Sequence, residues 1–304
     1  MSDTLNAKED VEILADKDPG VGLPGRVYLP GYSRTMGPQS HLFAERERLQ
    51  SLTWEHFDVK QLSPTIGAEL VGVDLSQELP DEVVSEIQQA LWDYKVIFFR
   101  NQEITSEQQI RFAQRFGELE IHPFLPPNTE TPELVRFEKN ANAAGYENQW
   151  HHDVTWRETP SQGAILRAIE IPPIGGDTLF VDANAAYEGL TQEMKDEIDS
   201  LNAVHDFLRA FGRQVPKEKL AEMREMYPLV KHPVVINHHQ TGKPLLYVNR
   251  IFVNGIEGYD EKEGFELIDA LCREFEVLEY SCRFKWEKNS IAFWDNQAVQ
   301  HYAT

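Results

Sequence analysis

The 304-residue chain has little cysteine and little positive charge. Its two cysteines, Cys272 and Cys282, cannot form the disulfide framework of a small secreted fold, and they suit a reducing cytosol. Twenty-nine lysines and arginines stand against fifty acidic residues, for a formal net charge of −21. Such a surface repels phosphate backbones and anionic lipids, which argues against nucleic acid and membrane surfaces as partners. A small anionic substrate is still compatible, because a few local cations can override the global field.

Long apolar runs are also absent. No run approaches the roughly eighteen apolar residues of a membrane span, and the acidic N-terminal twenty residues lack the apolar core of a signal peptide. The sequence contains no H-E-x-x-H, C-x-x-C, G-x-S-x-G or P-loop motif, which removes the usual hydrolase and phosphoryl-transfer interpretations. We therefore expect a soluble, cytoplasmic protein.

The chain divides into two regions that differ in composition and periodicity. Residues 1–50 are polar, rich in Gly and Pro, and without sustained periodicity. They predict an N-terminal arm that lies on the domain or on a neighbouring subunit of a homo-oligomer. Their stretch GVGLPG (residues 20–25) matches a dinucleotide-binding fingerprint in form only, since Pro24 lies inside it and no helical pattern follows. Residues 51–304 are expected to form the functional domain.

The pattern of residues 51–304 predicts many short strands and a few helices. Apolar periodicity predicts helices over 80–94 and roughly 260–275, and a helical interruption over roughly 184–228. A further helix begins with Thr105 and Gln108 in capping-box spacing and is expected to end at Gly117. The strand-like runs are FDVKQL, GAELVGVDL, KVIFFR, AILRAIEI, DTLFVDA, HPVVINH, PLLYVN, CRFKWEK and SIAFWDN. Short strands separated by turns indicate a mainly β sandwich or closed barrel with flanking helices.

The stretch QWHHDVTW (residues 149–156) is the first candidate site. Side chains alternate faces along a strand, so His151 and Asp153 would share one face and His152 the other. Two histidines and one carboxylate on one side of an ion form the facial triad typical of non-haem Fe(II), with open positions opposite. Alone, the pair is a weak signal, because a surface or core histidine beside a solvated acid would give the same pattern.

A third ligand has to come from another part of the chain. His301, in the distal stretch FWDNQAVQHYAT, is one candidate. His232, before a proline at a strand start, and the pair His238–His239, beside a QTGK turn, compete for the same role. The positions of these two groups are more typical of loop or strand-edge residues.

Seven segments that include these residues occur in a characteristic order from about Leu62 to the last residue. They are IGAELVGVDL, QRFGELEIHP, WHHDVTW, ILRAIEIPPIGGDTLFVD, HDFLRAF, HPVVINHHQTGKPLLYVN and WDNQAVQHYA. Through these seven segments and their order, the chain resembles the taurine dioxygenase and 2,4-dichlorophenoxyacetate dioxygenase (TauD/TfdA) family of Fe(II)/2-oxoglutarate-dependent oxygenases. The resemblance implies a double-stranded β-helix (jelly-roll) core with flanking helices.

The resemblance also implies a ligand set and a reaction. His151, Asp153 and His301 would bind Fe(II), and Thr178 would hold a carboxylate of the cosubstrate 2-oxoglutarate by a hydrogen bond. Together with O2, these would hydroxylate a small anionic organic substrate and release succinate and CO2. A sulfonate, as in taurine, or a sulfate ester is the expected substrate.

The same resemblance implies that His122 binds the anionic group of the substrate and that Phe211 and Phe252 line its pocket. The chain departs from the taurine dioxygenase pattern at three positions of the expected substrate pocket. Leu125 stands in place of a tyrosine, Glu147 in place of an asparagine, and Ala210 in place of a serine. Glu147 either pairs with a substrate amine or is solvated. These departures argue against an unchanged taurine pocket.

Family members carry two arginines beyond the distal histidine, one for 2-oxoglutarate and one for the substrate anion. Because the sequence stops at Thr304, we expect the domain to lack its C-terminal end.

Three alternatives remain open: a β-barrel binding module that retains metal without catalysis, an oxygenase acting on an aryloxy or carboxylic acid, and a zinc hydrolase with Glu147 as its general base.

Overall fold

The computed structural model describes residues 26–29, 32–35, 39–125, 130–139, 147–213 and 215–304. The stretch GVGLPG, like most of the expected N-terminal arm, lies outside these residues. The described part of the arm forms a hairpin and a helical segment, with bounds β1 (Arg26–Leu29), β2 (Tyr32–Thr35), η1 (Ser40–Leu42) and α2 (Phe43–Gln50). The helical segment lies on the domain, because Leu42 and Leu49 are buried and Arg48 pairs with Asp93 at 2.7 Å.

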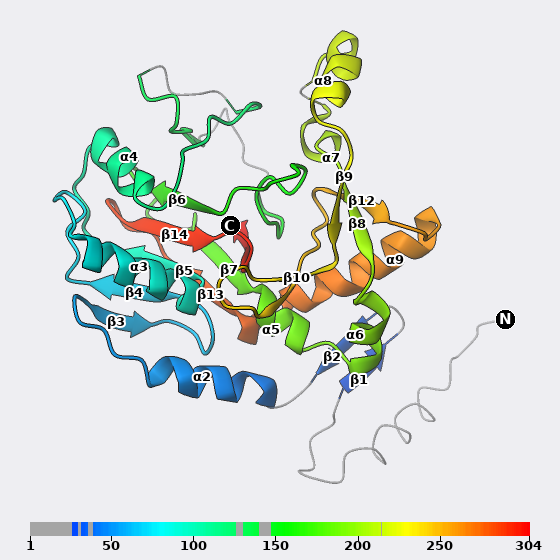
Figure 1. Ribbon diagram of the computed structural model, residues 1–304, viewed down its shortest axis with the longest axis horizontal. Coiled ribbons are helices and arrows are strands. Elements are labelled where there is room, and N and C mark those ends of the chain that lie inside the picture. Colours follow the sequence, from blue (N-terminus) through cyan, green and yellow to red (C-terminus); the bar gives the residue numbers. More distant parts are fainter. Residues whose placement is uncertain (1–25, 30–31, 36–38, 126–129, 140–146, 214) are drawn as a thin grey trace.

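A five-stranded sheet forms one layer of the domain (Figure 1). Its spatial order is β3 (Asp58–Gln61), β4 (Ala68–Val71), β5 (Val96–Phe99), β14 (Ile291–Asp295) and β6 (Gly163–Arg167), antiparallel except for the pair β4–β5. The central strand β5 is buried on both faces, which explains its uninterrupted apolar sequence. One face packs on the helices α3 (Asp81–Tyr94) and α4 (Ser106–Gln114).

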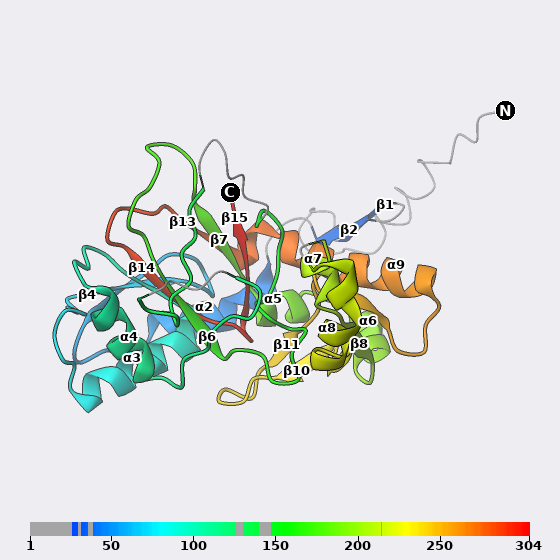
Figure 2. The ribbon, with the colours of Figure 1, turned by 90° about the horizontal axis from the view of Figure 1, so that it is seen from above.

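The other layer consists of shorter sheets. One has the order β13 (Ser281–Phe284), β7 (Thr178–Asp182), β15 (Val299–Ala303), and Figure 2 shows these strands side by side. Another has the order β12 (Val253–Ile256), β8 (Asn202–His205), β9 (Val230–Pro233), and β10 (Val235–Asn237) pairs with β11 (Pro244–Leu246). Phe98 of β5 stacks on Phe284 at 3.9 Å and meets Phe180 edge-on at 5.6 Å. The two layers therefore share one core, as expected for a jelly roll.

The remaining helices flank this core. Their bounds are α5 (Ala183–Glu188), α6 (Gln192–Ile198), α7 (Leu208–Phe211), η2 (Lys217–Lys219), α8 (Leu220–Met226), α9 (Glu261–Cys272), η3 (Arg273–Glu276) and η4 (Leu278–Tyr280). In Figure 1, α7 and α8 stand out from the body of the domain. Within the described residues, no helix combines the length and the apolar character needed to cross a bilayer. The expected mainly β class with flanking helices is confirmed.

Several local predictions are confirmed, and others are wrong. The helix over 80–94 is α3, and α4 begins with the expected capping box of Thr105 and Gln108. Gly117 does not end α4, because the last turn tightens at Arg115, whose backbone N–H bonds to Phe112 and Ala113. The helical interruption over 184–228 contains β8, a strand whose formation depends on pairing with β9 and β12 rather than on local pattern.

Candidate metal centre

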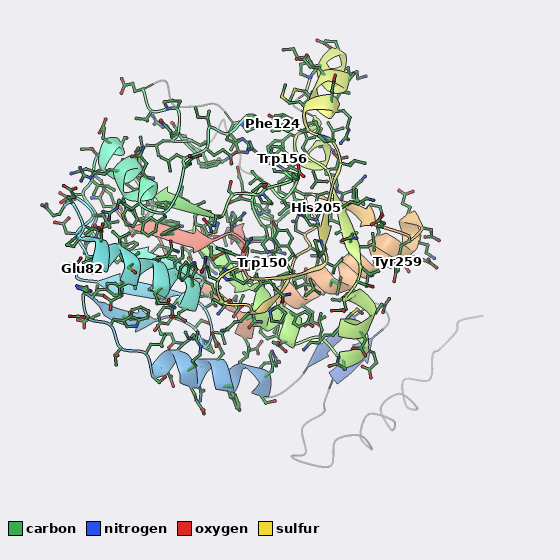
Figure 3. The ribbon with its side chains drawn as sticks, in the orientation of Figure 1. Glu82, Phe124, Trp150, Trp156, His205 and Tyr259 are labelled. Carbon is green, nitrogen blue, oxygen red and sulfur yellow. The ribbon has the colours of Figure 1, made fainter. Side chains whose placement is uncertain are left out.

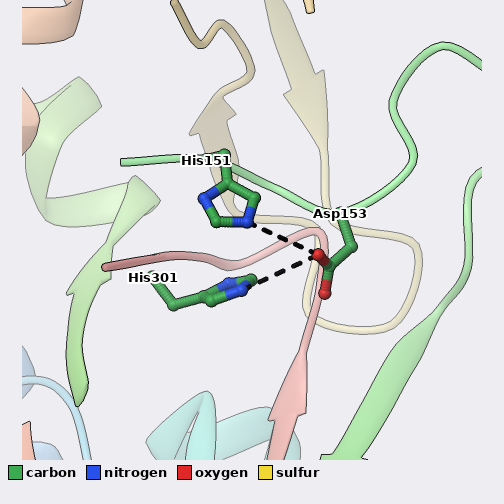
Figure 4. A group of neighbouring side chains, drawn as sticks. All are labelled: His151, Asp153 and His301. Carbon is green, nitrogen blue, oxygen red and sulfur yellow. Dashed lines mark ion pairs between the residues drawn. The ribbon is translucent and has the colours of Figure 1, made fainter. Parts of the chain in front are cut away.

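Backbone pairing brings His151 and His301 together. His301 lies within β15, where it pairs with Phe180 of β7. His151 forms a single antiparallel bridge to it: its N–H donates to the His301 carbonyl at 3.2 Å, and the reverse bond is 2.9 Å. Residues opposite each other in an antiparallel pair project to the same face. The two imidazole rings accordingly lie 4.2 Å apart, centroid to centroid (Figure 4).

Asp153 completes the group from a turn. The Nε2 atoms of His151 and His301 each lie 3.7 Å from Asp153 Oδ1 (Figure 4). This separation is too long for a hydrogen bond, but it suits three ligands arranged around an ion about 2 Å from each. Within the described parts of the chain, no other set of three or more His, Cys, Asp or Glu side chains is placed to hold a metal ion. The expected strand over HHD is only partly right, since the chain turns after the bridge at His151.

The orientation of His151 and the lowered pKa of His301 both suit metal binding. His151 Nδ1 lies 2.8 Å from the Gln149 carbonyl, which can only accept, so Nδ1 carries the hydrogen and Nε2 offers its lone pair. Burial lowers the pKa of His301 to about 4, although the nearby negative charge of Asp153 acts to raise it. Neutral imidazoles and a carboxylate are the forms that bind metals. The donor set therefore fits the facial triad of non-haem Fe(II).

Asn296, which the sequence analysis did not identify, holds the Asp153 backbone. Its Oδ1 accepts from the Asp153 N–H at 2.7 Å, and its Nδ2 donates to the Asp153 carbonyl at 2.9 Å and to the Ser161 carbonyl at 3.0 Å. The side chain is only 1% exposed. An amide directly after the buried strand β14 is the signal that could have identified it, because a buried amide requires partners.

His152 points away from this group, as expected. It is fully buried, and its ring packs against Tyr247 at 4.7 Å and Phe275 at 6.1 Å. Burial, reinforced by nearby histidines that include His151, holds its pKa well below the ordinary value. A neutral imidazole in an apolar environment fills space rather than binding an ion.

The competing histidines have other partners. His232 Nε2 lies 2.9 Å from the carbonyls of both Thr155 and Arg157. His238 Nε2 lies 2.8 Å from Asp295 Oδ2, inside the core. Neither residue belongs to the His151–Asp153–His301 group. Both make structural hydrogen bonds.

Thr178 lies close to the group along β7. It is two residues from Phe180, the partner of His301, so its side chain is on the same face as that of His301. Its Oγ1 accepts a hydrogen bond from Trp286 Nε1 at 2.9 Å. That bond fixes the rotamer and leaves the hydroxyl hydrogen available to a further acceptor.

His122 is oriented by the backbone that follows it. Its Nδ1 accepts from the N–H groups of Phe124 at 3.2 Å and Leu125 at 3.1 Å, so Nε2 carries the hydrogen. Burial lowers the pKa of His122, while the charges of Glu120 and Asp153 act in the opposite direction. The neutral ring thus offers one N–H donor near the carboxylate of the candidate metal centre.

An aromatic wall adjoins His122 and contains the two predicted phenylalanines. The wall consists of Phe124, Trp156, Phe207, Phe211 and Phe252. The ring of Phe211 lies 5.7 Å from that of His122, 4.9 Å from Phe124 and 6.3 Å from Phe252. Figure 3 shows Phe124 and Trp156 beside the α7–α8 segment. The structure therefore places an apolar surface beside the polar donor.

Leu125 and Glu147 are the two remaining residues that the sequence assigned to the substrate site. Leu125 is partly buried, and its backbone N–H helps to orient His122. Glu147 pairs with Lys139 at 2.6 Å, and its carbonyl accepts from the Ala303 N–H at 3.2 Å. The charge of the Glu147 carboxylate is thus balanced by a lysine of the same chain.

Comparisons with known proteins found a matching family model and similar relatives. Residues 58–304 match the family model described as "Taurine catabolism dioxygenase TauD, TfdA family". An alpha-ketoglutarate-dependent sulfate ester dioxygenase of Pseudomonas putida is 36% identical over 255 residues, which cover 81% of this chain and 83% of that protein. An alkylsulfatase of Acinetobacter baylyi is 33% identical over 257 residues, 82% of this chain and 80% of that one.

A solved structure shares the fold. The crystal structure of a taurine dioxygenase from Burkholderia xenovorans superposes with a TM-score of 0.71 at 36% identity, covering 82% of this chain and 83% of that chain. Similarity of this extent confirms the jelly-roll architecture.

Proposed function

The chain belongs to the TauD/TfdA family of dioxygenases, and on that premise we propose that it hydroxylates the carbon next to the anionic group of a sulfate ester or sulfonate, in a reaction that depends on Fe(II), 2-oxoglutarate and O2. The observation that carries the proposal is the convergence of two imidazoles and one carboxylate, with all ligand atoms within 4.8 Å of one another. A bound iron with 2-oxoglutarate would supply the oxidising power for the hydroxylation.

Residues around the candidate centre have separate roles in this proposal. His151, Asp153 and His301 hold the metal, and Asn296 fixes the turn that carries the carboxylate. Thr178 donates its free hydroxyl hydrogen to a carboxylate of 2-oxoglutarate, on the face that it shares with His301. His122 donates its Nε2–H to the anionic group of the substrate.

The organic part of the substrate is proposed to be apolar. The aromatic wall adjoins His122, and Ala210 of the same cluster carries no hydroxyl. The one acid proposed from the sequence for a substrate amine, Glu147, already pairs with Lys139. An alkyl sulfate satisfies these surroundings better than taurine, whose ammonium group would lose its hydration beside phenylalanines without a charged partner. An alkyl sulfate substrate also fits the names of two relatives, the sulfate ester dioxygenase of Pseudomonas putida and the alkylsulfatase of Acinetobacter baylyi.

A succinate-release assay tests the proposal. The protein is supplied with Fe(II), ascorbate, 2-oxoglutarate and O2, and hexyl sulfate, taurine and 2,4-dichlorophenoxyacetate are compared as substrates. We expect substrate-dependent succinate formation to be largest with hexyl sulfate, together with release of sulfate. A preference for the aryloxy acid would favour the alternative carboxylic acid substrate.

An anaerobic titration separates catalysis from mere metal retention. Addition of 2-oxoglutarate to the Fe(II)-loaded protein is expected to produce a weak visible absorption band. Metal binding with neither a band nor succinate release would favour the alternative of a non-catalytic binding module.

The location and the assembly of the protein are also part of the proposal. We propose that residues 51–304 act in the cytoplasm as part of a homo-oligomer. Both cysteines are free and buried, and burial raises the pKa of each thiol to about 12, which suits a reducing compartment. Size-exclusion chromatography with light scattering would determine the oligomeric state.

A further inference from the structure

The residue after the candidate metal ligand Asp153 has an unusual backbone. Val154 has a φ of +48°, in the left-handed region that β-branched residues rarely occupy. It is also buried, at 6% exposure. Such a conformation persists only where its surroundings impose it, and these sites are often functional. The turn formed by residues 153–157 must therefore be held from outside.

Buried hydrogen bonds hold this turn on both sides. On the Asp153 side, Asn296 binds the backbone N–H and carbonyl of the ligand itself. On the other side, the Thr155 hydroxyl lies 2.9 Å from His205 Nδ1 and 3.3 Å from Asn249 Nδ2. Thr155 and Asn249 are fully buried, as is His205.

The direction of these bonds can be assigned. Asn249 Oδ1 accepts from the backbone N–H groups of Ile251 at 3.1 Å and Phe252 at 2.8 Å, so its Nδ2 is the donor to Thr155 Oγ1. The Thr155 hydroxyl hydrogen is then available to His205 Nδ1. His205 is neutral, because burial lowers its pKa to about 3.

Asn249 therefore joins two functional regions. Its oxygen fixes the turn that carries Phe252, a member of the aromatic wall. Its nitrogen bonds to the hydroxyl two residues after the ligand Asp153. A second link runs through the backbone, where the Asp206 N–H donates to the Phe252 carbonyl at 2.8 Å, directly after His205.

We propose that Thr155, Asn249 and His205 form a positioning relay that couples the aromatic wall of the substrate pocket to the carboxylate ligand of the metal centre. None of the three contacts the metal directly in this proposal. They act by fixing the strained turn at Val154, so that the placement of Asp153 depends on the backbone turn that carries Phe252. The inference rests on the proposed metal centre.

Variants at Thr155 test the relay through metal binding. Thr155→Val keeps the shape and removes the hydroxyl, and we expect the anaerobic Fe(II) dissociation constant to rise about tenfold, the lower end of the range for loss of a direct partner of a metal ligand, because Thr155 acts through the turn. Thr155→Ser restores the hydroxyl and should stay close to wild type. The matched control is Thr65→Val, because Thr65 is also buried and its hydroxyl has no hydrogen-bond partner among the described residues.

A double-variant cycle tests the coupling itself. Asn249→Ala should weaken Fe(II) binding although Asn249 touches no ligand, and it should raise the KM for hexyl sulfate. Combining it with Thr155→Val should weaken Fe(II) binding no further than the more severe single variant, because both changes interrupt one relay. Phe252→Ala removes the ring alone and should raise KM with little change in Fe(II) affinity.

Other results would overturn the inference. If Thr155→Val lost stability but bound Fe(II) as tightly as Thr65→Val, the hydroxyl would be only structural. Additive losses in the double variant would likewise exclude coupling. Failure of the wild-type protein to bind Fe(II) would instead overturn the proposed metal centre, and the relay with it.

Discussion

Neighbouring histidines at the candidate metal centre have opposite surroundings. His151 has its Nδ1–H bonded to the Gln149 carbonyl and its Nε2 directed at Asp153. His152 is enclosed by Tyr247 and Phe275. A single bridge to His301 sets this difference, because it fixes which way His151 faces. At the scale of residues, the backbone partner determines the chemistry of a side chain.

Substitution of the two histidines should therefore have unequal effects on metal binding. His151→Ala removes a ligand and is expected to weaken anaerobic Fe(II) binding by more than a hundredfold, about 3 kcal/mol or more. His152→Ala leaves a cavity in the core and should cost stability, on the order of 2 kcal/mol or more, with Fe(II) affinity nearly unchanged. Calorimetric titration with Fe(II) and urea unfolding distinguish the two. Equal losses of Fe(II) affinity would contradict the assignment.

His122 provides a prediction for substrate binding. His122→Ala removes the only donor that we assign to the substrate anion, and a hydrogen bond to a charged group contributes about 1.5–3 kcal/mol. The KM for hexyl sulfate should rise at least about tenfold by that measure. His122→Gln, which can still donate, should recover part of the loss. A variant with unchanged KM would remove His122 from the substrate site.

Elements of the fold depend on both local and distant partners. The helix α4 has a complete local signal, since the Thr105 hydroxyl accepts from the Gln108 N–H and the Gln108 side chain accepts from the Thr105 N–H. The strand β15 has no comparable local signal. It forms because β7 offers a paired edge, and this pairing is what places His301.

The capping box of α4 should contribute measurably to stability. Thr105→Ala leaves the N–H of Gln108 without its acceptor and is expected to lower the free energy of unfolding by about 1 kcal/mol. Thr105→Ser keeps the hydroxyl, and because Ser is at least as good an N-cap as Thr, its stability should stay close to wild type. Urea unfolding followed by circular dichroism measures both. Equal stability of the Ala and Ser variants would show that the cap does not stabilise the helix.

On the scale of the whole molecule, buried and partly buried histidines occur at several points of the fold. Burial lowers the pKa of each of them, and the group comprises His41, His122, His152, His205, His232 and His301. In the unfolded chain these side chains bind protons below pH about 6.5. The unfolded state therefore takes up more protons than the folded state as the pH falls.

The metal-free protein should consequently lose stability in mild acid. A histidine with a pKa of about 3 in the folded state, such as His205, contributes a loss of about 1 kcal/mol between pH 6.5 and 5.5. The stability that the neutral, buried His205 ring allows is fully present above pH 6.5. It is lost progressively as the pH falls from 6.5 toward the folded-state pKa, because only the unfolded chain takes up the proton. Urea unfolding at pH 7.5, 6.5 and 5.5 measures the decline. His152→Phe should make it shallower by about 1 kcal/mol over the same interval, and an unchanged slope would contradict the assigned burial effect.

Prediction from the sequence succeeded where signals were local. The apolar spacing of α3 and the capping box of α4 need only neighbouring residues, and both appear as expected. The end of α4 at Gly117 was wrong, and the helical region predicted over roughly 184–228 is present but also contains the strand β8. Helix ends and short strands such as β8 depend on tertiary contacts that no local pattern contains.

The sequence by itself determined the family, the mainly β class and the residues that the structure brings together as a candidate triad, because these depend on residue types in a fixed order. Only the tertiary structure decided how the triad forms. The bridge of His151 to β15 and the clamp by Asn296 join residues far apart in the chain, and the strained turn at Val154 lies between residues held in this way. Such contacts exist only after the two layers have packed, so alternation along one short segment could indicate the face of a side chain but not its partners.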